Sequence, residues 1–333
     1  MSQSAPPGPG ILLLQLGTPD APTTPAVRRY LAQFLSDRRV IDLPRAKWLL
    51  VLHGIVLRTR PRRSAALYRR IWTEEGSPLA VISARQASGL AARLNARGDE
   101  RSGTVRVAVA MRYGQPSIAS AVRALEAAGV ERILALPMYP QYASASTGSS
   151  LECLFGELAT RRVVPSLRLV PPYPGDTGYI NALAATARRS LEGVDVDHLV
   201  VSFHGMPERY VLDEPYADHC TLTARLLLRA LEWPEDRATM TYQSRFGSEP
   251  WLQPYTDETL VSLARGGVRR VAAICPGFPA DCLETLEEMA ITNRELFLEA
   301  GGTGYHFIPG LNDSDEWLDA LADMAARELQ GWV

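Results

Sequence analysis

The chain has 333 residues, which is too long for one ordinary core and suits two domains of about 150 residues each. Apolar residues make up 46% and charged residues 22%, proportions that are typical of a soluble globular protein. The formal net charge of −2 leaves no basic field, so we expect no nucleic-acid partner.

Short β-rich runs alternate with longer helical patterns along the whole chain. The first half contains four predicted strands, at 11–17, 105–111, 133–138 and 167–170. The second half contains four more, at 198–204, 238–244, 271–277 and 304–310. Helices are predicted between them, at 25–35, 79–96, 117–128, 178–192, 217–232, 256–265, 281–299 and 314–329. Such alternation predicts βαβ units and parallel sheets that helices cover on both faces.

The two series of elements have similar length and order, which predicts an α/β fold of two similar domains. We place them at 10–172 and 173–333, because the join near 172–178 is rich in turn residues. Each domain should hold a four-stranded parallel sheet flanked by helices, with a cleft between the domains. Ligands of open parallel sheets bind outside the carboxyl ends of strands, so polar residues there are the candidates for function.

His204 stands where an apolar strand stops, in the stretch "VVSFHGMPERY" (200–210). Gly205 and Pro207 follow at once and force a turn, which would direct the imidazole into the cleft. One interpretation is a hydrogen-bonded structural histidine at a strand end. The other is a functional group that accepts a proton or binds a metal.

Two glutamates lie on one face of the helix predicted at 281–299. Asp281 is a good N-cap, and Glu284 then takes the position of a capping-box glutamate. Glu288 follows one turn later, so the two carboxylates could instead pass a cation or protons inward. Cys282, at the helix start, is either a stabilised thiolate or a small buried hydrophobe.

Other segments allow both a structural and a functional interpretation. The "ASTGSS" turn (145–150) either caps a helix or binds an anion through its backbone N–H groups. The apolar segment Trp48–Leu57 is too short to span a bilayer, but it makes a peripheral membrane contact plausible. A basic cluster follows that either is solvated or holds carboxylates or anionic lipid: Arg58, Arg60, Arg62 and Arg63.

The four cysteines, at Cys153, Cys220, Cys275 and Cys282, form no C-x-x-C pair. This spacing argues against a structural zinc site and against a disulfide framework. No secretory signal is visible in the Pro/Gly-rich start, so we expect a cytoplasmic protein.

The chain resembles the ferrochelatases in order from about residue 10 to residue 330. The matching motifs of the N-terminal half are "LGTP", "RYLAQFLSDRRVIDLP", "YRRIWTEEGSPL", "MRYG" and "PMYPQYASASTGSS". Those of the C-terminal half are "SFHGMP", "YQSRFGSEPWLQPYTDE" and "CPGFPADCLETLEE". The form "PADCLETLEE" is most similar to proteobacterial-type enzymes that make protoheme.

The resemblance implies insertion of Fe²⁺ into protoporphyrin IX, with heme as the product and release of two protons. Matched by position, His204 would be the histidine that binds the metal or accepts protons. Glu284 would be the metal-binding and catalytic carboxylate opposite it, and Glu288 the next member of a proton or metal path. The residues that would line the porphyrin pocket are Tyr68, Arg112, Tyr139, Ser144 and Trp251, and Arg63 would face a propionate.

The chain departs from parts of the family pattern. Cys282 stands where some relatives have a second histidine, and Thr292 stands where some continue the acidic face. Many animal enzymes bind a [2Fe–2S] cluster through a C-terminal extension and an upstream cysteine. This chain stops at Val333 and has Ser144 at the upstream position, so we expect no cluster and no prosthetic group.

Three alternatives remain open on the sequence. The first is the same reaction on coproporphyrin III, whose four carboxylates need more cationic contacts. The second is a cobalt chelatase for a reduced tetrapyrrole, although those chains rely on more histidines than the five here. The third is a non-catalytic porphyrin or heme carrier. The partners expected are protoporphyrin IX, Fe²⁺ and heme, and the expected assembly is a monomer.

Overall fold

The computed structural model describes residues 8–98, 103–247 and 249–332. Contacts divide the chain into two units. The first holds the described residues up to Tyr139, then Ala143–Pro172 and the described residues from Leu318 onward. The second holds Pro140–Tyr142 and Tyr173–Trp317.

The first unit is built on a parallel sheet with the strand order β2-β1-β3-β4. Its strands are β1 (Gly10–Thr18), β2 (Arg106–Gly114), β3 (Arg132–Pro137) and β4 (Ser166–Leu169). Residues Ile11 to Leu14 of β1 are fully buried, because helices cover the sheet on both faces. The continuous apolar run of β1 is therefore typical of a central parallel strand.

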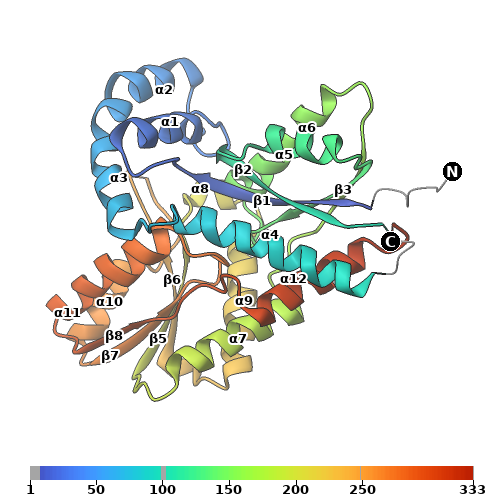
Figure 1. Cartoon of the computed structure of the whole chain (residues 1–333). Helices are drawn as coiled ribbons and strands as arrows, with labels where there is room; N and C mark the ends of the chain where they lie inside the picture. The colour runs from blue at the N-terminus through green and yellow to red at the C-terminus, as the bar shows by residue number, and fades with distance from the viewer. Residues whose placement is uncertain (1–7, 99–102, 248, 333) are drawn as a thin grey trace. The chain divides into compact units, whose positions relative to one another are not determined.

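The first unit also holds the helices α1 (Thr24–Leu35), α2 (Arg45–Val51), α3 (Leu57–Ile71), α4 (Pro78–Arg97), α5 (Ile118–Ala127) and α6 (Ser149–Ala159), with π-helical segments η1 (Leu52–Val56) and η2 (Ser144–Gly148). Helices α1, α4, α5 and α6 pack against this sheet, whereas α3 packs beside α1, with α2 next to it (Figure 1). Helices α2 and α3 were not predicted from the sequence, because α3 contains Pro61 and a dense basic cluster. Leu57, Pro61, Ala65 and Tyr68 nevertheless form a buried stripe at helical spacing.

The second unit repeats the arrangement with the order β6-β5-β7-β8, again all parallel. Its strands are β5 (His198–His204), β6 (Ala238–Gln243), β7 (Arg270–Ile274) and β8 (Gly304–Phe307). Its helices are α7 (Thr177–Leu191), α8 (Glu208–Val211), α9 (Tyr216–Leu231), η3 (Glu235–Arg237), α10 (Thr256–Arg265), η4 (Glu284–Thr292) and α11 (Asn293–Glu299). The predicted fold class, two similar four-stranded parallel sheets flanked by helices, is confirmed; the cleft between them stays a prediction.

The last helix, α12 (Asp315–Glu328), begins in the second unit and continues into the first. In the first unit it lies beside α4 (Figure 1), where Arg93 pairs with Asp319 at 2.6 Å and Arg97 with Asp323 at 2.6 Å. Leu318 packs directly over Gly89. The sequence predicted two uninterrupted domains, 10–172 and 173–333, whereas the described residues from Leu318 onward belong to the first unit.

Each sheet has one place where the strand order reverses. The chain leaves the first strand of the unit toward one neighbour and returns to pair on its other side. Ligands of open parallel sheets bind at the carboxyl edge at such a point. In the second unit this edge carries His204, the last residue of β5. Among the described residues, no helix has the length and apolar character needed to cross a bilayer.

Candidate active site

His204 is held at the carboxyl end of β5 opposite Gln243 of β6. The next residue, Gly205, donates its N–H to the Gln243 carbonyl at 2.7 Å. A Cβ on Gly205 would lie 2.7 Å from that carbonyl oxygen and 3.2 Å from the Trp251 ring. Only glycine fits this approach, and the chain turns away immediately after the imidazole.

The protonation pattern of the His204 ring follows from one contact. Its Nδ1 lies 2.6 Å from the carbonyl oxygen of Gly205. A carbonyl oxygen can only accept, so Nδ1 carries the proton and the neutral ring has its lone pair on Nε2. The ring is partly exposed, and its centroid is 6.3 Å from that of Phe278. Nε2 is therefore the atom that could accept a proton or bind a metal.

Glu288 is clamped by the segment that follows β6. The backbone N–H of Ser244 donates to Oε1 of Glu288 at 2.7 Å, and the Ser244 hydroxyl donates to Oε2. Ser244 has a φ of 67°, a left-handed conformation that costs a non-glycine residue about 1–2 kcal/mol. The two bonds to the carboxylate offset this cost and fix the position of Glu288.

His204, Glu284 and Glu288 form an interacting group within the second unit. Burial raises the pKa of the Glu288 carboxyl above its ordinary value. The hydrogen bonds from Ser244 and the charge of His204 lower this pKa, whereas the charge of Glu284 raises it further. Electrostatic interactions thus connect Glu288 to both the imidazole and the Glu284 carboxylate that the sequence singled out. Among the described residues, no group of three or more histidine, cysteine, aspartate or glutamate side chains is arranged to hold a metal ion.

The capping-box interpretation of Glu284 is wrong. The N–H of Asp281, which such a glutamate would bind, donates instead to the Asn312 side chain at 2.9 Å. The N–H of Cys282 donates to Thr285 Oγ1 at 3.0 Å, and Thr285 in turn donates to Asp281 at 2.8 Å. Asparagine and threonine satisfy the start of the segment, so the Glu284 carboxylate has no capping role.

The predicted single helix over 281–299 is in fact the π-helix η4 followed by α11. Glu284 is the first residue of η4, and Glu288 lies in its middle. Wide π turns are rare and frequently occur at functional sites. The side chain of Gln243 donates to the Glu284 carbonyl at 3.0 Å, which attaches the start of η4 to β6.

Cys282 is a buried thiol beside Glu284. Burial raises its pKa well above the ordinary value, and the charge of Glu284 and a hydrogen bond to it raise the pKa further. The thiol is therefore protonated near neutral pH. Of the two interpretations given from sequence, the structure favours the small buried side chain over the thiolate.

Trp251 is buried in the second unit, in edge contact with Phe246 at a centroid distance of 4.9 Å. Its chain segment is joined to the turn after His204, because Leu252 donates its N–H to the Met206 carbonyl at 2.9 Å. The indole is thus held beside the same turn that presents the imidazole.

The other predicted pocket residues lie in the first unit. Tyr68 is a buried residue of α3, and Arg63 is exposed on the same helix. Tyr139 follows β3, and its hydroxyl accepts the N–H of Leu16 at 2.6 Å, near the carboxyl end of β1. Arg112 and Ser144 belong to a network that also contains residues the sequence analysis did not single out.

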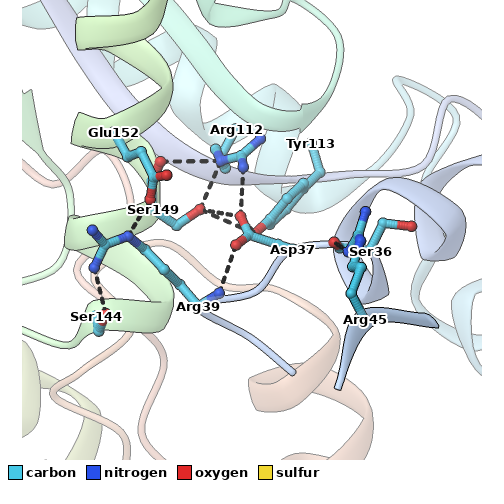
Figure 2. A network of polar contacts seen from close by, with 9 residues as sticks. All are labelled: Ser36, Asp37, Arg39, Arg45, Arg112, Tyr113, Ser144, Ser149 and Glu152. Atoms are coloured by element: carbon cyan, nitrogen blue, oxygen red, sulfur yellow. Dashed lines mark hydrogen bonds and ion pairs between the residues drawn. The ribbon is translucent and has the colours of Figure 1, made fainter. Parts of the chain in front are cut away.

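Asp37 is the centre of this network, which Figure 2 shows. Its side chain is only 6% exposed and forms an ion pair with Arg112. It also accepts from the hydroxyls of Tyr113 (2.8 Å) and Ser149 (2.5 Å), and from the backbone N–H of Arg39 (2.8 Å). One sequence signal could have found it. An acid just after the carboxyl end of a helix opposes the helix dipole, so it needs another reason to be there.

Asp37 stays ionised despite its burial. Burial alone would raise its pKa, but hydrogen bonds from Ser149, the Arg39 amide and Tyr113, together with the charge of Arg112, lower it below the ordinary value. The Arg112 guanidinium is held further by Ser149, whose hydroxyl is 2.6 Å from Nε. Arg112 is therefore a neutralised, fixed cation.

The ferrochelatase family model matches residues 8–329 of this chain. The chain belongs to the ferrochelatase family. It is 53% identical to a ferrochelatase of Methylibium petroleiphilum over 97% of this chain and 88% of the relative. It is 51% identical to a ferrochelatase of Thioalkalivibrio sulfidiphilus over 97% of this chain and 87% of the relative.

A solved structure of SirB from Bacillus subtilis has a similar fold, with a TM-score of 0.53. The alignment covers 74% of this chain and 90% of SirB, with 14% sequence identity, so the similarity concerns the fold alone. This ferrochelatase is thus a metal chelatase, an enzyme of heme synthesis that works by metal insertion. The carrier alternative has no support, because the relatives over nearly the whole chain are enzymes.

We predict that Glu284→Gln leaves the fold intact but greatly slows metallation. The substitution keeps the size of the side chain and removes its charge. The N–H of Asp281 is bound by Asn312, so the free energy of unfolding should change by less than about 0.5 kcal/mol. Turnover should fall by about two orders of magnitude or more. Thermal melts and metallation rates measure the two effects.

The matched control for this prediction is Glu299→Gln, which removes an exposed carboxylate at the end of α11. It should preserve turnover. Normal turnover in Glu284→Gln would contradict a catalytic role for that carboxylate.

We predict that Asp37→Asn destabilises the protein in a pH-dependent way. At pH 7 the free energy of unfolding should fall by about 2 kcal/mol, because a nearly buried ion pair and its hydrogen bonds are weakened. The folded-state pKa of Asp37 is lowered, so its stabilisation is complete above the unfolded value of 3.8 and is lost as pH falls further. Urea melts at pH 7 and at pH 3 measure the difference.

Wild type and Asp37→Asn should therefore converge in stability at the lower pH. Asp20→Asn, which removes an exposed partner of Arg29, is the control and should have little effect at either pH. A stability difference that does not change with pH would contradict the ionised state of Asp37.

Proposed function

We propose that this ferrochelatase inserts Fe²⁺ into protoporphyrin IX to form heme b, the terminal step of heme synthesis. Iron is a substrate in this reaction. The observation that carries the proposal is the imidazole of His204 at the carboxyl end of β5, which interacts electrostatically with the carboxyl of Glu288, itself in interaction with Glu284. The relatives named ferrochelatase match this chain over nearly its whole length, which supports iron as the metal.

The reaction needs two kinds of polar chemistry. A porphyrin carries two inner N–H groups that must lose their protons, and the metal ion must lose its bound water. In our proposal Nε2 of His204 accepts protons or binds the metal. Glu284 binds the metal or takes a proton from the other side of the ring. Glu288, whose pKa is raised by burial, suits a group that exchanges protons near neutral pH.

The porphyrin ring itself is apolar and stiff, so we propose that aromatic side chains hold and bend it. Remote binding contacts can be used to strain the reacting part of a substrate. The residues proposed to contact the porphyrin are Tyr68, Arg63, Arg112, Tyr139, Ser144 and Trp251. Buried Tyr68 and Trp251 supply rigid apolar surface, which supports their assignment.

We propose further that the enzyme has no [2Fe–2S] cluster and no other prosthetic group. The four cysteines lie on separate elements, and burial raises the pKa of the Cys220, Cys275 and Cys282 thiols, whereas cluster ligands are thiolates. Purified protein should lack acid-labile sulfide. Stoichiometric iron and sulfide would overturn this proposal.

We propose that the enzyme is cytoplasmic and monomeric and that it touches a membrane surface. The segment Trp48–Leu57 exposes Leu50 by 77% and Ile55 by 61%, and exposed arginines follow it on α3. Apolar side chains beside cations suit the surface of an anionic bilayer. In a flotation assay the wild type should rise with anionic vesicles, whereas a Leu50→Ser, Ile55→Ser double variant should stay in the lower fractions. A wild type that does not rise with the vesicles would contradict the proposed membrane contact.

The proposed reaction is tested by anaerobic incubation of the protein with Fe²⁺ and protoporphyrin IX. Loss of porphyrin fluorescence and the appearance of the heme spectrum report metallation. A parallel reaction with coproporphyrin III compares the two candidate substrates. Faster metallation of coproporphyrin III at equal concentration would overturn the assignment of protoporphyrin IX.

We predict that His204→Ala folds and binds protoporphyrin but metallates it about 100 to 1,000 times more slowly, the usual effect of losing a positioned acid–base group. The fold should persist because the side chain lies at the strand end, partly exposed. Porphyrin affinity should persist because apolar walls supply most of it. Tryptophan fluorescence quenching measures binding, and the anaerobic assay measures rate.

His306→Ala is the matched control, because this histidine lies on the edge strand β8 and contacts Ser190. Its metallation rate should stay within about twofold of the wild type. Near-normal turnover in His204→Ala would remove His204 from the mechanism and leave the turn after β5 as a structural feature.

A further inference from the structure

We propose that Arg39 binds a propionate carboxylate of the porphyrin substrate, with Asp37 as the residue that positions it. This inference rests on the proposed function, since it names a specificity contact for the same substrate. Neither residue was singled out from the sequence. Both belong to the network in Figure 2.

Arg39 lies at the carboxyl edge of the sheet of the first unit. The segment that contains it follows α1, and Asp37 attaches this segment to Arg112 and Tyr113 at the carboxyl end of β2. Asp37 also accepts from Ser149, the first residue of α6. The carboxyl edge is where open parallel sheets bind ligands, so Arg39 stands at the expected ligand position.

The guanidinium of Arg39 makes two contacts that matter for binding. Its NH1 donates to the Ser144 hydroxyl at 2.7 Å, and its Nε forms an ion pair with Glu152. A guanidinium is a planar fork that binds carboxylates through two parallel hydrogen bonds. The Glu152 carboxylate thus marks a position that a substrate carboxylate could occupy beside Arg39.

The ion pair between Arg39 and Glu152 is exchangeable. The two side chains are 38% and 65% exposed, and exposed ion pairs contribute little to stability. A substrate carboxylate that replaces Glu152 therefore loses little on displacing it. It would also keep the Ser144 hydroxyl as a neighbour of the guanidinium.

Arg112 is the nearest alternative cation, and its environment differs. Its partner Asp37 is only 6% exposed, and breaking a nearly buried pair leaves an uncompensated charge. Its Nε is held by the carbonyl and hydroxyl of Ser149. The charge of Arg112 is therefore already neutralised by Asp37, whatever surface its side chain offers to the ring, and Arg39 is the arginine of this network whose charge a ligand carboxylate can use.

Asp37 positions Arg39 through the main chain. Its Oδ1 accepts the N–H of Arg39 at 2.8 Å, while its Oδ2 accepts from Tyr113 and Ser149. The backbone at residue 39 is thereby anchored to β2 and α6 before any ligand arrives. Such preorganisation lowers the entropy lost on binding.

The test compares a porphyrin dicarboxylic acid with its dimethyl ester, which lacks both carboxylates, in the same detergent. Arg39→Gln should raise the KM for the diacid about tenfold, the effect of losing one charged hydrogen-bonded contact. Its kcat should stay within about threefold, and its KM for the ester should equal that of the wild type. Asp37→Asn should show the same selective rise in KM.

Arg38→Gln is the matched control, because the neighbouring arginine is exposed and the same charge is lost. It should leave both KM values unchanged. Glu152→Gln should lower the KM for the diacid about two- to threefold, because the competing carboxylate is gone. Arg39→Lys keeps the charge but not the fork, and it carries the test if Arg39→Gln does not fold.

Equal effects of Arg39→Gln on the diacid and the ester would overturn the inference, as would an equal effect of Arg38→Gln. Fluorescence quenching gives the dissociation constants of both porphyrins without turnover. A wild type that binds the diacid without metallating it would overturn the proposed function alone. The binding comparison would then still decide the role of Arg39.

Discussion

The buried side-chain amide of Gln243 is the contact on which the candidate site of the second unit depends. Its Oε1 accepts from Ser202 of β5 at 2.8 Å and from the Cys275 thiol after β7 at 3.3 Å. Its Nε2 donates to the Glu284 carbonyl of η4. One amide thus joins β5, its own strand β6 and the residue that follows β7 to the π-helix. Because a buried amide must have its polar atoms satisfied, these elements are held in one arrangement around it.

Two nearly buried carboxylates in this chain have opposite pKa shifts. The pKa of Asp37 is lowered because several donors and the Arg112 cation outweigh its burial. The pKa of Glu288 is raised because burial and the charge of Glu284 outweigh the bonds from Ser244 and the charge of His204. Asp37, which is ionised at neutral pH, suits an anchor. A carboxyl that is more easily protonated, like Glu288, suits proton exchange during metal insertion.

Much of the fold was predictable because its signals are local. Apolar runs of strand length that alternate with helical patterns predicted two sheets of parallel strands. His204 stood out because an apolar run ends on it and a glycine follows. The helices over 45–71 were missed, since Pro61 and the basic cluster hide a buried stripe. The capping-box pattern at Glu284 misled, because Asn312, a distant residue, satisfies the N–H of Asp281.

By itself the sequence determined the fold class, the family and the candidates His204, Glu284 and Glu288. Only the tertiary structure decided the surroundings, and hence the chemical state, of each candidate group. The contact of Nδ1 leaves the lone pair of the neutral His204 ring on Nε2. Burial keeps the Cys282 thiol protonated, and Asp37 lies at the centre of a charged network. The physical reason is distance along the chain. Asp37 meets Arg112 and Ser149 across 75 and 112 positions, and no local pattern encodes such a contact. Folding brings these partners together, and their charges and burial then set the chemistry of each group.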